Sequence, residues 1–178
     1  MTDAATLRRF RPGDAAETRE VFWEAVRIGA ADHYTEAQLA DWVADPEMPD
    51  DWGDWLDRHF TVVAEDESGR IAGFFMLEAS GYLNMAFVRP EWRQTGLADR
   101  LHAAILAEAR AQGMPRLTVW ASRLARRFLA RHGWTLDSEP PPLSGHPVPT
   151  GDAEPIDVAM KLDLVAATVR APDPHATK

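Results

Sequence analysis

The chain has 178 residues, a formal net charge of −9 at pH 7 and no cysteine. Without cysteine it has no disulfides, no thiolate metal site and no cysteine-linked covalent intermediate, and its acidic charge argues against general nucleic-acid binding. The length suits one domain. No apolar run approaches the about 18 residues of a membrane span and no secretory leader is recognisable, so we expect a cytoplasmic protein that does not insert into membranes.

Charge is unevenly distributed along the chain. Residues 89–131 contain nine arginines and three acidic residues, which gives +6, so the rest of the chain sums to −15. Residues 32–57 contain nine acidic residues and neither lysine nor arginine. Such a run is typical of a solvated face, and the alternative is a surface that attracts a cation.

The N-terminal third of the sequence predicts a short strand followed by helices. Asp14-x-x-Glu17 has the form of a capping box, which marks a helix start, and Thr35-x-x-Gln38 repeats that signal. The apolar residues of these helices, tryptophans included, share one face and are interpreted as packing groups rather than as a ligand-binding cluster. The strand is expected at 7–10, and the helices begin near residues 15, 36 and 51.

From residue 60 the hydrophobic period changes to that of strands. Polar turns at 65–69 and 79–81 separate three runs of β-branched and aromatic residues, which predicts an antiparallel meander. Side-chain alternation along the third strand predicts that Tyr82, Asn84 and Ala86 share one face and that the intervening residues, Leu83 among them, share the other. The three strands are expected at 60–64, 70–78 and 82–88.

The third strand leads through a proline turn into a loop of small residues and a helix. The first N–H groups of a helix have no partner within it, and the helix dipole adds positive potential there, so the loop predicts an anion-binding cradle. Gly96 and Ala98 let a phosphate approach the backbone, and Arg93 supplies a permanent charge. The alternative is an ordinary strand–loop–helix corner.

The rest of the sequence predicts two more helices and three more strands. The helix after the cradle should end near residue 112, and the final strand should run antiparallel to the strand before it. Residues 140–151 are expected to form a turn-rich loop, and residues 165–178 a mobile tail. The expected elements are strands at 117–120, 134–137 and 156–162 and a helix at 122–131.

Arg93-x-x-Gly96-x-Ala98 after a strand resembles the pyrophosphate-binding signature of the GCN5-related N-acetyltransferases, the GNAT family. Residues 122–134 are similar to a second family segment, Asn-x-x-Ala-x-x-x-Tyr-x-x-x-Gly-Phe, with Ser122 at the asparagine and Ala125 at the alanine. The order of the predicted elements over residues 5–164 also matches the family. Residues 32–42 are similar to a segment of the bacterial YafP-like group.

The resemblance implies one domain over residues 1–164 with an α/β (α+β) GNAT-like acyl-CoA N-acyltransferase fold. Its sheet should be mixed and mostly antiparallel, with helices on both faces. Acetyl-CoA would be the co-substrate, and acetyl would pass directly to an amine of a small acceptor, cationic if the acidic residues attract it. The implied coenzyme-binding residues are Ala86, Phe87, Val88, Arg93, Gln94, Thr95, Gly96, Leu97, Ala98, Ser122 and Ala125.

The position of the family tyrosine that protonates the departing thiolate corresponds to Leu129, whose side chain has no proton to donate. This departure favours an alternative function, a non-catalytic acyl-CoA-binding sensor or interaction protein with the same fold. A third interpretation, an interaction module without coenzyme, requires both motif matches to be accidental. A symmetric homodimer is compatible with the pattern but not required by it.

An ammonium group must lose a proton before its nitrogen can attack a thioester, so an acetyltransferase site needs a base. Glu78 is the first candidate, with Asp32 and His33 as others, and each has a simple alternative as a solvent-facing residue. Asn84 does not titrate but could orient the acceptor or a water. His102 is expected on a helix surface, and no metal site is predicted. The candidate acceptor-binding residues are His33, Tyr34 and Tyr82.

Overall fold

The computed structural model describes residues 5–43, 49–139 and 157–164. The predicted turn-rich loop at 140–151 and the predicted tail at 165–178 lie outside these residues. No helix in the described ranges is long and apolar enough to cross a membrane.

The first sheet, as formed by the described residues, contains four antiparallel strands in the order β1–β2–β3–β4. The last three form the predicted meander, because runs of apolar residues alternate with short polar turns. Asp66 fixes the first turn by accepting hydrogen bonds from the N–H groups of Ser68 and Arg70. The strands are β1 (Thr6–Arg9), β2 (Phe60–Glu65), β3 (Ile71–Leu77) and β4 (Leu83–Val88).

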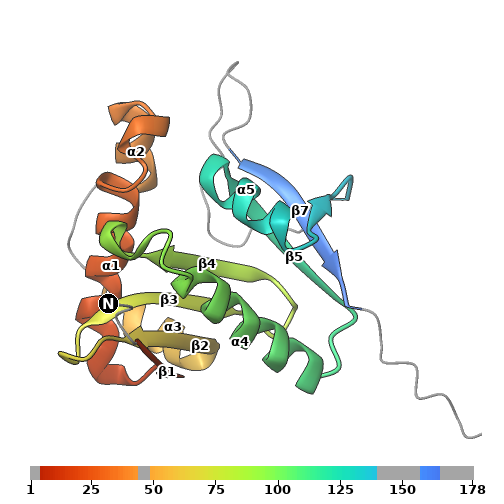
Figure 1. The fold of residues 1–178 in the computed structure, drawn as a ribbon, viewed down its shortest axis with the longest axis horizontal. Coiled ribbons are helices and arrows are strands. Elements are labelled where there is room, and N and C mark those ends of the chain that lie inside the picture. The colour runs from red at the N-terminus through yellow and green to blue at the C-terminus, as the bar shows by residue number, and fades with distance from the viewer. Residues whose placement is uncertain (1–4, 44–48, 140–156, 165–178) are drawn as a thin grey trace, which may run out of the picture.

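Within the described ranges, the second sheet contains three strands in the order β5–β7–β6. Strand β7 lies in the middle and is antiparallel to both neighbours, which confirms the expected direction of the final strand. The two sheets diverge from the start of β4 and β5, as Figure 1 shows. The strands are β5 (Arg116–Ser122), β6 (Thr135–Leu136) and β7 (Asp157–Asp163).

Helices cover both faces of the first sheet, as predicted (Figure 1). Helix α4 packs on one face, and α1 with α3 packs on the other, while α5 packs against the second sheet. The α-helices are α1 (Ala15–Arg27), α2 (Glu36–Trp42), α3 (Trp52–Arg58), α4 (Leu97–Ala111) and α5 (Arg123–Arg131), with single 3₁₀ turns at Pro12–Asp14, Ala31–His33 and Pro90–Trp92.

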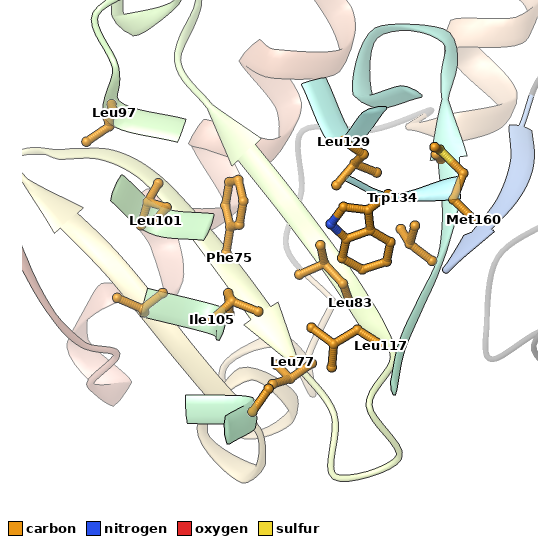
Figure 2. Packing of buried hydrophobic residues seen from close by; sticks show 14 of the residues in the cluster. Phe75, Leu77, Leu83, Leu97, Leu101, Ile105, Leu117, Leu129, Trp134 and Met160 are labelled. Atoms are coloured by element: carbon orange, nitrogen blue, oxygen red, sulfur yellow. The ribbon is translucent and has the colours of Figure 1, made fainter. Parts of the chain in front are cut away.

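One buried apolar cluster continues from α4 through both sheets and so holds the diverging sheets together. Leu101 of α4 and Leu83 of β4 belong to it, as does Trp134, whose ring lies between Leu129 and Leu83 in Figure 2. A second cluster fills the space between the first sheet and α1, α2 and α3. Trp52 lies in that cluster with 5% of its surface exposed, which confirms it as a packing group.

The two predicted capping boxes have different outcomes. Thr35 accepts a hydrogen bond from the N–H of Gln38, whose side chain accepts from the N–H of Thr35, so the second box is confirmed. The prediction at Asp14 is wrong, since its side chain does not cap α1. Its carboxylate instead binds the Arg8 guanidinium at 2.7 and 2.9 Å, because the preceding strand places a cation within reach.

Candidate active site

Strands β4 and β5 run side by side at their start and then separate. Among the described residues, they pair through one parallel bridge, between Tyr82 and Thr118. The N–H of Thr118 donates to the carbonyl of Gly81 at 3.0 Å. Beyond this point each strand keeps its partner on the outer side, β3 for β4 and β7 for β5. Among the described residues, the two inner edges therefore diverge without strand pairing beyond the bridge, and we call the region between these edges the gap.

Backbone amides of β4 point into this gap. The N–H of Arg89 donates to the carbonyl of Ala72 on the β3 side. Amides along a strand alternate between its two edges, so the N–H groups of Ala86 and Val88 face β5 instead. The predicted coenzyme-binding stretch thus presents two backbone donors to a linear ligand. The ring of Phe87 packs against Phe22 of α1, on the face of the sheet that α1 covers.

The loop after β4 has the conformation that the anion cradle requires. Gln94 and Gly96 both adopt left-handed backbone angles, with φ of 63° and 85°. The first helical hydrogen bond runs from the N–H of Arg100 to the carbonyl of Gly96, so the amides of Leu97 and Ala98 have no partner within α4. The Leu97 amide makes one long hydrogen bond, at 3.4 Å, to the Thr95 hydroxyl. Such a concave row of amides at a helix start attracts anions. A side-chain carbon added at Gly96 would meet no atom within 4 Å, so the cradle is open.

The side chain of Arg93 points away from the cradle. Its guanidinium donates to the carbonyls of Gly29 and Ala25 at the end of α1, and burial lowers its pKa. Carbonyls at a helix C-terminus carry negative potential, which suits a cation. Arg93 therefore ties the cradle loop to α1, whereas the sequence predicted that it would supply charge to the phosphates. Thr95 also holds the loop, because its hydroxyl donates to the carbonyl of Trp92 at 2.8 Å.

The two proposed catalytic residues are in contact. The amide Nδ2 of Asn84 donates to the Glu78 carboxylate at 2.6 Å. A β-bulge explains this contact: Met76 pairs with Met85 and Leu77 pairs with Leu83, so Asn84 is the extra residue without a cross-strand partner. The predicted alternation is wrong here, because the bulge turns Leu83 to the α4 side that Ala86 also faces.

Tyr34 bridges the N-terminal helices and the second sheet. Its hydroxyl accepts a hydrogen bond from the N–H of Arg123 at 2.8 Å and also bonds the side chain of Ser122. Burial is the main cause of its raised pKa. The Arg123 guanidinium lies 5.7 Å from the ring and donates to the carbonyl of His33. Tyr34 is thus held at the end of β5, whereas the side chains of His33 and Asp32 are exposed.

Tyr82 crosses from β4 towards β5. Its hydroxyl accepts from the N–H of Trp120 and so lies in the gap near its narrow end. Burial, together with the carboxylates of Glu78 and Asp157, raises its pKa to about 12 despite that hydrogen bond. The hydroxyl therefore stays protonated at neutral pH and is available as a donor to a ligand.

The second family segment forms the end of β5, α5 and the turn after it, without the family tyrosine. Ser122 caps α5 by accepting from the N–H of Ala125 at 3.2 Å, and Ala125 packs against the main core. Leu129 is 1% exposed and points into that core. No proton donor therefore stands at this position.

His102 is buried, so the prediction that it lies on the helix surface is wrong. It is 1% exposed and accepts a hydrogen bond from the Trp134 indole at 3.0 Å. Burial lowers its pKa to about 4, which keeps the ring neutral. It belongs to the core beneath α4. The described residues contain no group of three or more His, Asp or Glu side chains arranged to hold a metal ion.

Sequence analysis did not identify two charged residues, one directly after β4 and one at the start of β7. Arg89 at the end of β4 is fully buried and binds Glu20 at 2.5 Å and Glu24 at 2.7 Å. Asp157 begins β7 and lies opposite Ser122. An arginine directly before a proline turn gives no local sign of burial, and only the pairing of β7 with β5 brings Asp157 here.

Comparisons with known proteins agree with this geometry. A family model described as an acetyltransferase (GNAT) domain matches residues 30–143. The uncharacterized N-acetyltransferase YafP of Escherichia coli K12 is 28% identical over 128 residues, which are 72% of this chain and 79% of YafP.

Two solved structures illustrate the similarity of the fold. A GCN5-related N-acetyltransferase from Rhodopseudomonas palustris has a TM-score of 0.75 at 25% identity, and the alignment covers 92% of this chain and 99% of that one. YncA from Salmonella typhimurium, solved with acetyl-CoA, has a TM-score of 0.64 at 17% identity, with 96% and 99% covered. At that lower identity the likeness is one of fold.

Proposed function

Because this chain belongs to the GNAT acetyltransferase family, we propose that it transfers acetyl from acetyl-CoA directly to an amine of a small acceptor. One observation carries the proposal: two sets of backbone donors flank the loop after β4, the amides of Leu97 and Ala98 at the start of α4 and the gap-facing amides of Ala86 and Val88. The first set suits phosphates, and the second suits the amide-containing arm of the coenzyme. YncA, which shares the fold, was solved with acetyl-CoA.

The amides of β4 also suit the chemistry at the thioester. When an amine attacks, negative charge develops on the carbonyl oxygen, and a fixed N–H donor stabilises it. The N–H groups of Ala86 and Val88 already point into the gap, so no rearrangement is needed. Fixed donors of this kind typically contribute about 3 kcal/mol each to transition-state stabilisation.

Glu78 is the proposed base for the acceptor amine. The Asn84 amide holds one oxygen of its carboxylate at 2.6 Å, and the Ser80 hydroxyl lies 3.3 Å from the other. Both neighbours donate, so the carboxylate is fixed in position, and no cation among the described residues forms an ion pair with it. A carboxylate held in this way can take a proton from an ammonium group directly or through a water.

The departing thiolate needs no donor at Leu129 for transfer to proceed. A thiol has a pKa near 8.5, so its thiolate is a tolerable leaving group and can be protonated by water. Loss of the family tyrosine is therefore expected to slow the reaction rather than abolish it.

Transfer to a panel of primary amines tests this function. We expect the native chain to acetylate at least one cationic amine, and Glu78→Gln to lower kcat by about a hundredfold or more while acetyl-CoA still binds. Glu108→Gln is the matched control, because Glu108 lies on α4 and bonds Gln112. Binding of acetyl-CoA without transfer to any amine would favour the non-catalytic acyl-CoA-binding alternative, and unchanged kcat in Glu78→Gln would remove Glu78 as the base.

A further inference from the structure

The first residue of β7 places a second carboxylate beside the end of β5. Asp157 pairs with Ser122 across the sheet, at the end of β5. The alternate residues Val158, Met160 and Leu162 face the main core. Asp157 therefore projects from the opposite face of the sheet, away from that core.

This carboxylate has an unsatisfied oxygen. Its Oδ1 is shielded from solvent and has no hydrogen-bond partner among the described residues. Burial raises the pKa of Asp157 to about 6. Buried carboxylates are normally paired or hydrogen-bonded, because removing their charge from water is costly. The residue as a whole is partly exposed.

The neighbouring cations bind other groups. Arg123, which follows Ser122 in the chain, donates to the carbonyl of His33. Lys161 of β7 binds Asp137 at 3.3 Å. The groups that interact electrostatically with Asp157 are the hydroxyls of Tyr34 and Tyr82, which raises the pKa of both tyrosines.

Two carboxylates thus act on Tyr82, Glu78 from the turn after β3 and Asp157 from β7. Glu78 is fixed by Asn84 and is the proposed base for the reacting amine. The Oδ1 of Asp157 keeps no hydrogen-bond partner among the described residues. A cation supplied by the ligand would satisfy it, with the Tyr82 and Tyr34 hydroxyls as further polar contacts.

We propose, on the basis of the proposed acetyltransferase function, that Asp157 binds a second cationic group of the acceptor. The acceptors are then diamines or other amines with a second positive charge, and Asp157 selects them. The reacting amine lies at Glu78 and the second ammonium lies at Asp157. Asp157 acts in specificity and takes no part in the transfer of the acetyl group.

Acetyl transfer to 1,4-diaminobutane and to 1-aminobutane tests this role, because the two probes have the same carbon chain and differ in one amine. We expect the native chain to prefer the diamine by about tenfold to a hundredfold in kcat/KM, as one charge-assisted hydrogen bond implies. Asp157→Asn should remove that preference by raising KM, with kcat little changed. Asp163→Asn, on the same strand and paired with Arg116, is the matched control.

Calorimetric titration of 1,4-diaminobutane into the chain with coenzyme A present gives a readout without turnover. We expect affinity to fall about tenfold or more in a folded Asp157→Asn variant and not in Asp163→Asn. Equal diamine binding, or a diamine preference retained by Asp157→Asn, would overturn the role of Asp157 and leave the acetyltransferase function standing. No binding of acetyl-CoA and no transfer to any amine would overturn the proposed function, and this inference with it.

Discussion

Arg89→Met should strongly destabilise the fold at the end of β4. The Arg89 side chain is fully buried, its Nε donates to the carbonyl of Ile71 at 2.8 Å, and it binds Glu24, whose side chain is only 18% exposed. Methionine keeps the apolar stem but leaves the Ile71 carbonyl without its donor and leaves Glu24 with only its longer contact to Arg70, at 3.6 Å. Breaking a buried ion pair on one side costs about 3–5 kcal/mol. The contact with the half-exposed Glu20 adds little, because exposed pairs contribute about 0–1 kcal/mol.

Urea unfolding followed by tryptophan fluorescence measures this cost. Arg70→Met is the control, because Arg70 is 45% exposed and its carboxylate contacts, with Glu24 and Glu91, are 3.6 and 3.3 Å long. We expect the control to lose at most about 1 kcal/mol. Arg89 lowers the pKa of Glu20, so the stability from this pair is present above pH 4.5 and is lost as the pH falls below it. A cost for Arg89→Met no larger than that of Arg70→Met would refute the reasoning.

Two further predictions concern the site. Gly29→Ala should lower the free energy of unfolding by about 1–3 kcal/mol. The new methyl would lie 2.7 Å from the Ala25 carbonyl oxygen and against the Arg93 guanidinium. Thermal unfolding checks this against Gly13→Ala, whose added methyl would meet nothing within 4 Å. Burial raises the pKa of Asp157 from 3.8 to about 6, so the folded state loses stability as the pH rises through that window. Asp157→Asn should therefore stabilise the fold by up to about 3 kcal/mol at pH 8 and by little at pH 4. Urea unfolding at both pH values measures the two effects. Equal effects would contradict a raised pKa of a buried Asp157 carboxyl.

The sequence predicted the elements well wherever local patterns determine them. The strands of the meander and the order of the later elements follow from hydrophobic period and turn residues, which act within a few positions. The cap at Thr35 is correct for the same reason, since its partner is three residues away. The cradle too is local, because Gly96 and the start of α4 lie together in the chain.

The sequence failed where a distant segment decides the contact. Asp14 is an acceptable cap, but Arg8 competes for its carboxylate. His102 lies one position after Leu101, outside the apolar stripe of α4. It is buried nevertheless, because the Trp134 indole donates a hydrogen bond to its ring. The orientation of Arg93 depends on where α1 ends, and the bulge at Asn84 depends on the register of β3.

The central claim is that the loop at Gly96 holds the diphosphate of acetyl-CoA, and calorimetric titration with acetyl-CoA tests it most directly. The native chain should bind, and a folded Gly96→Glu variant should not, because a carboxylate would stand where the phosphates lie. Gly96→Ala controls for backbone strain at φ 85°, and Gly69→Glu controls for strain and charge at a distant open turn with φ 87°; both should bind. No binding by the native chain at millimolar coenzyme, or binding by Gly96→Glu equal to that of the native chain, would contradict the account.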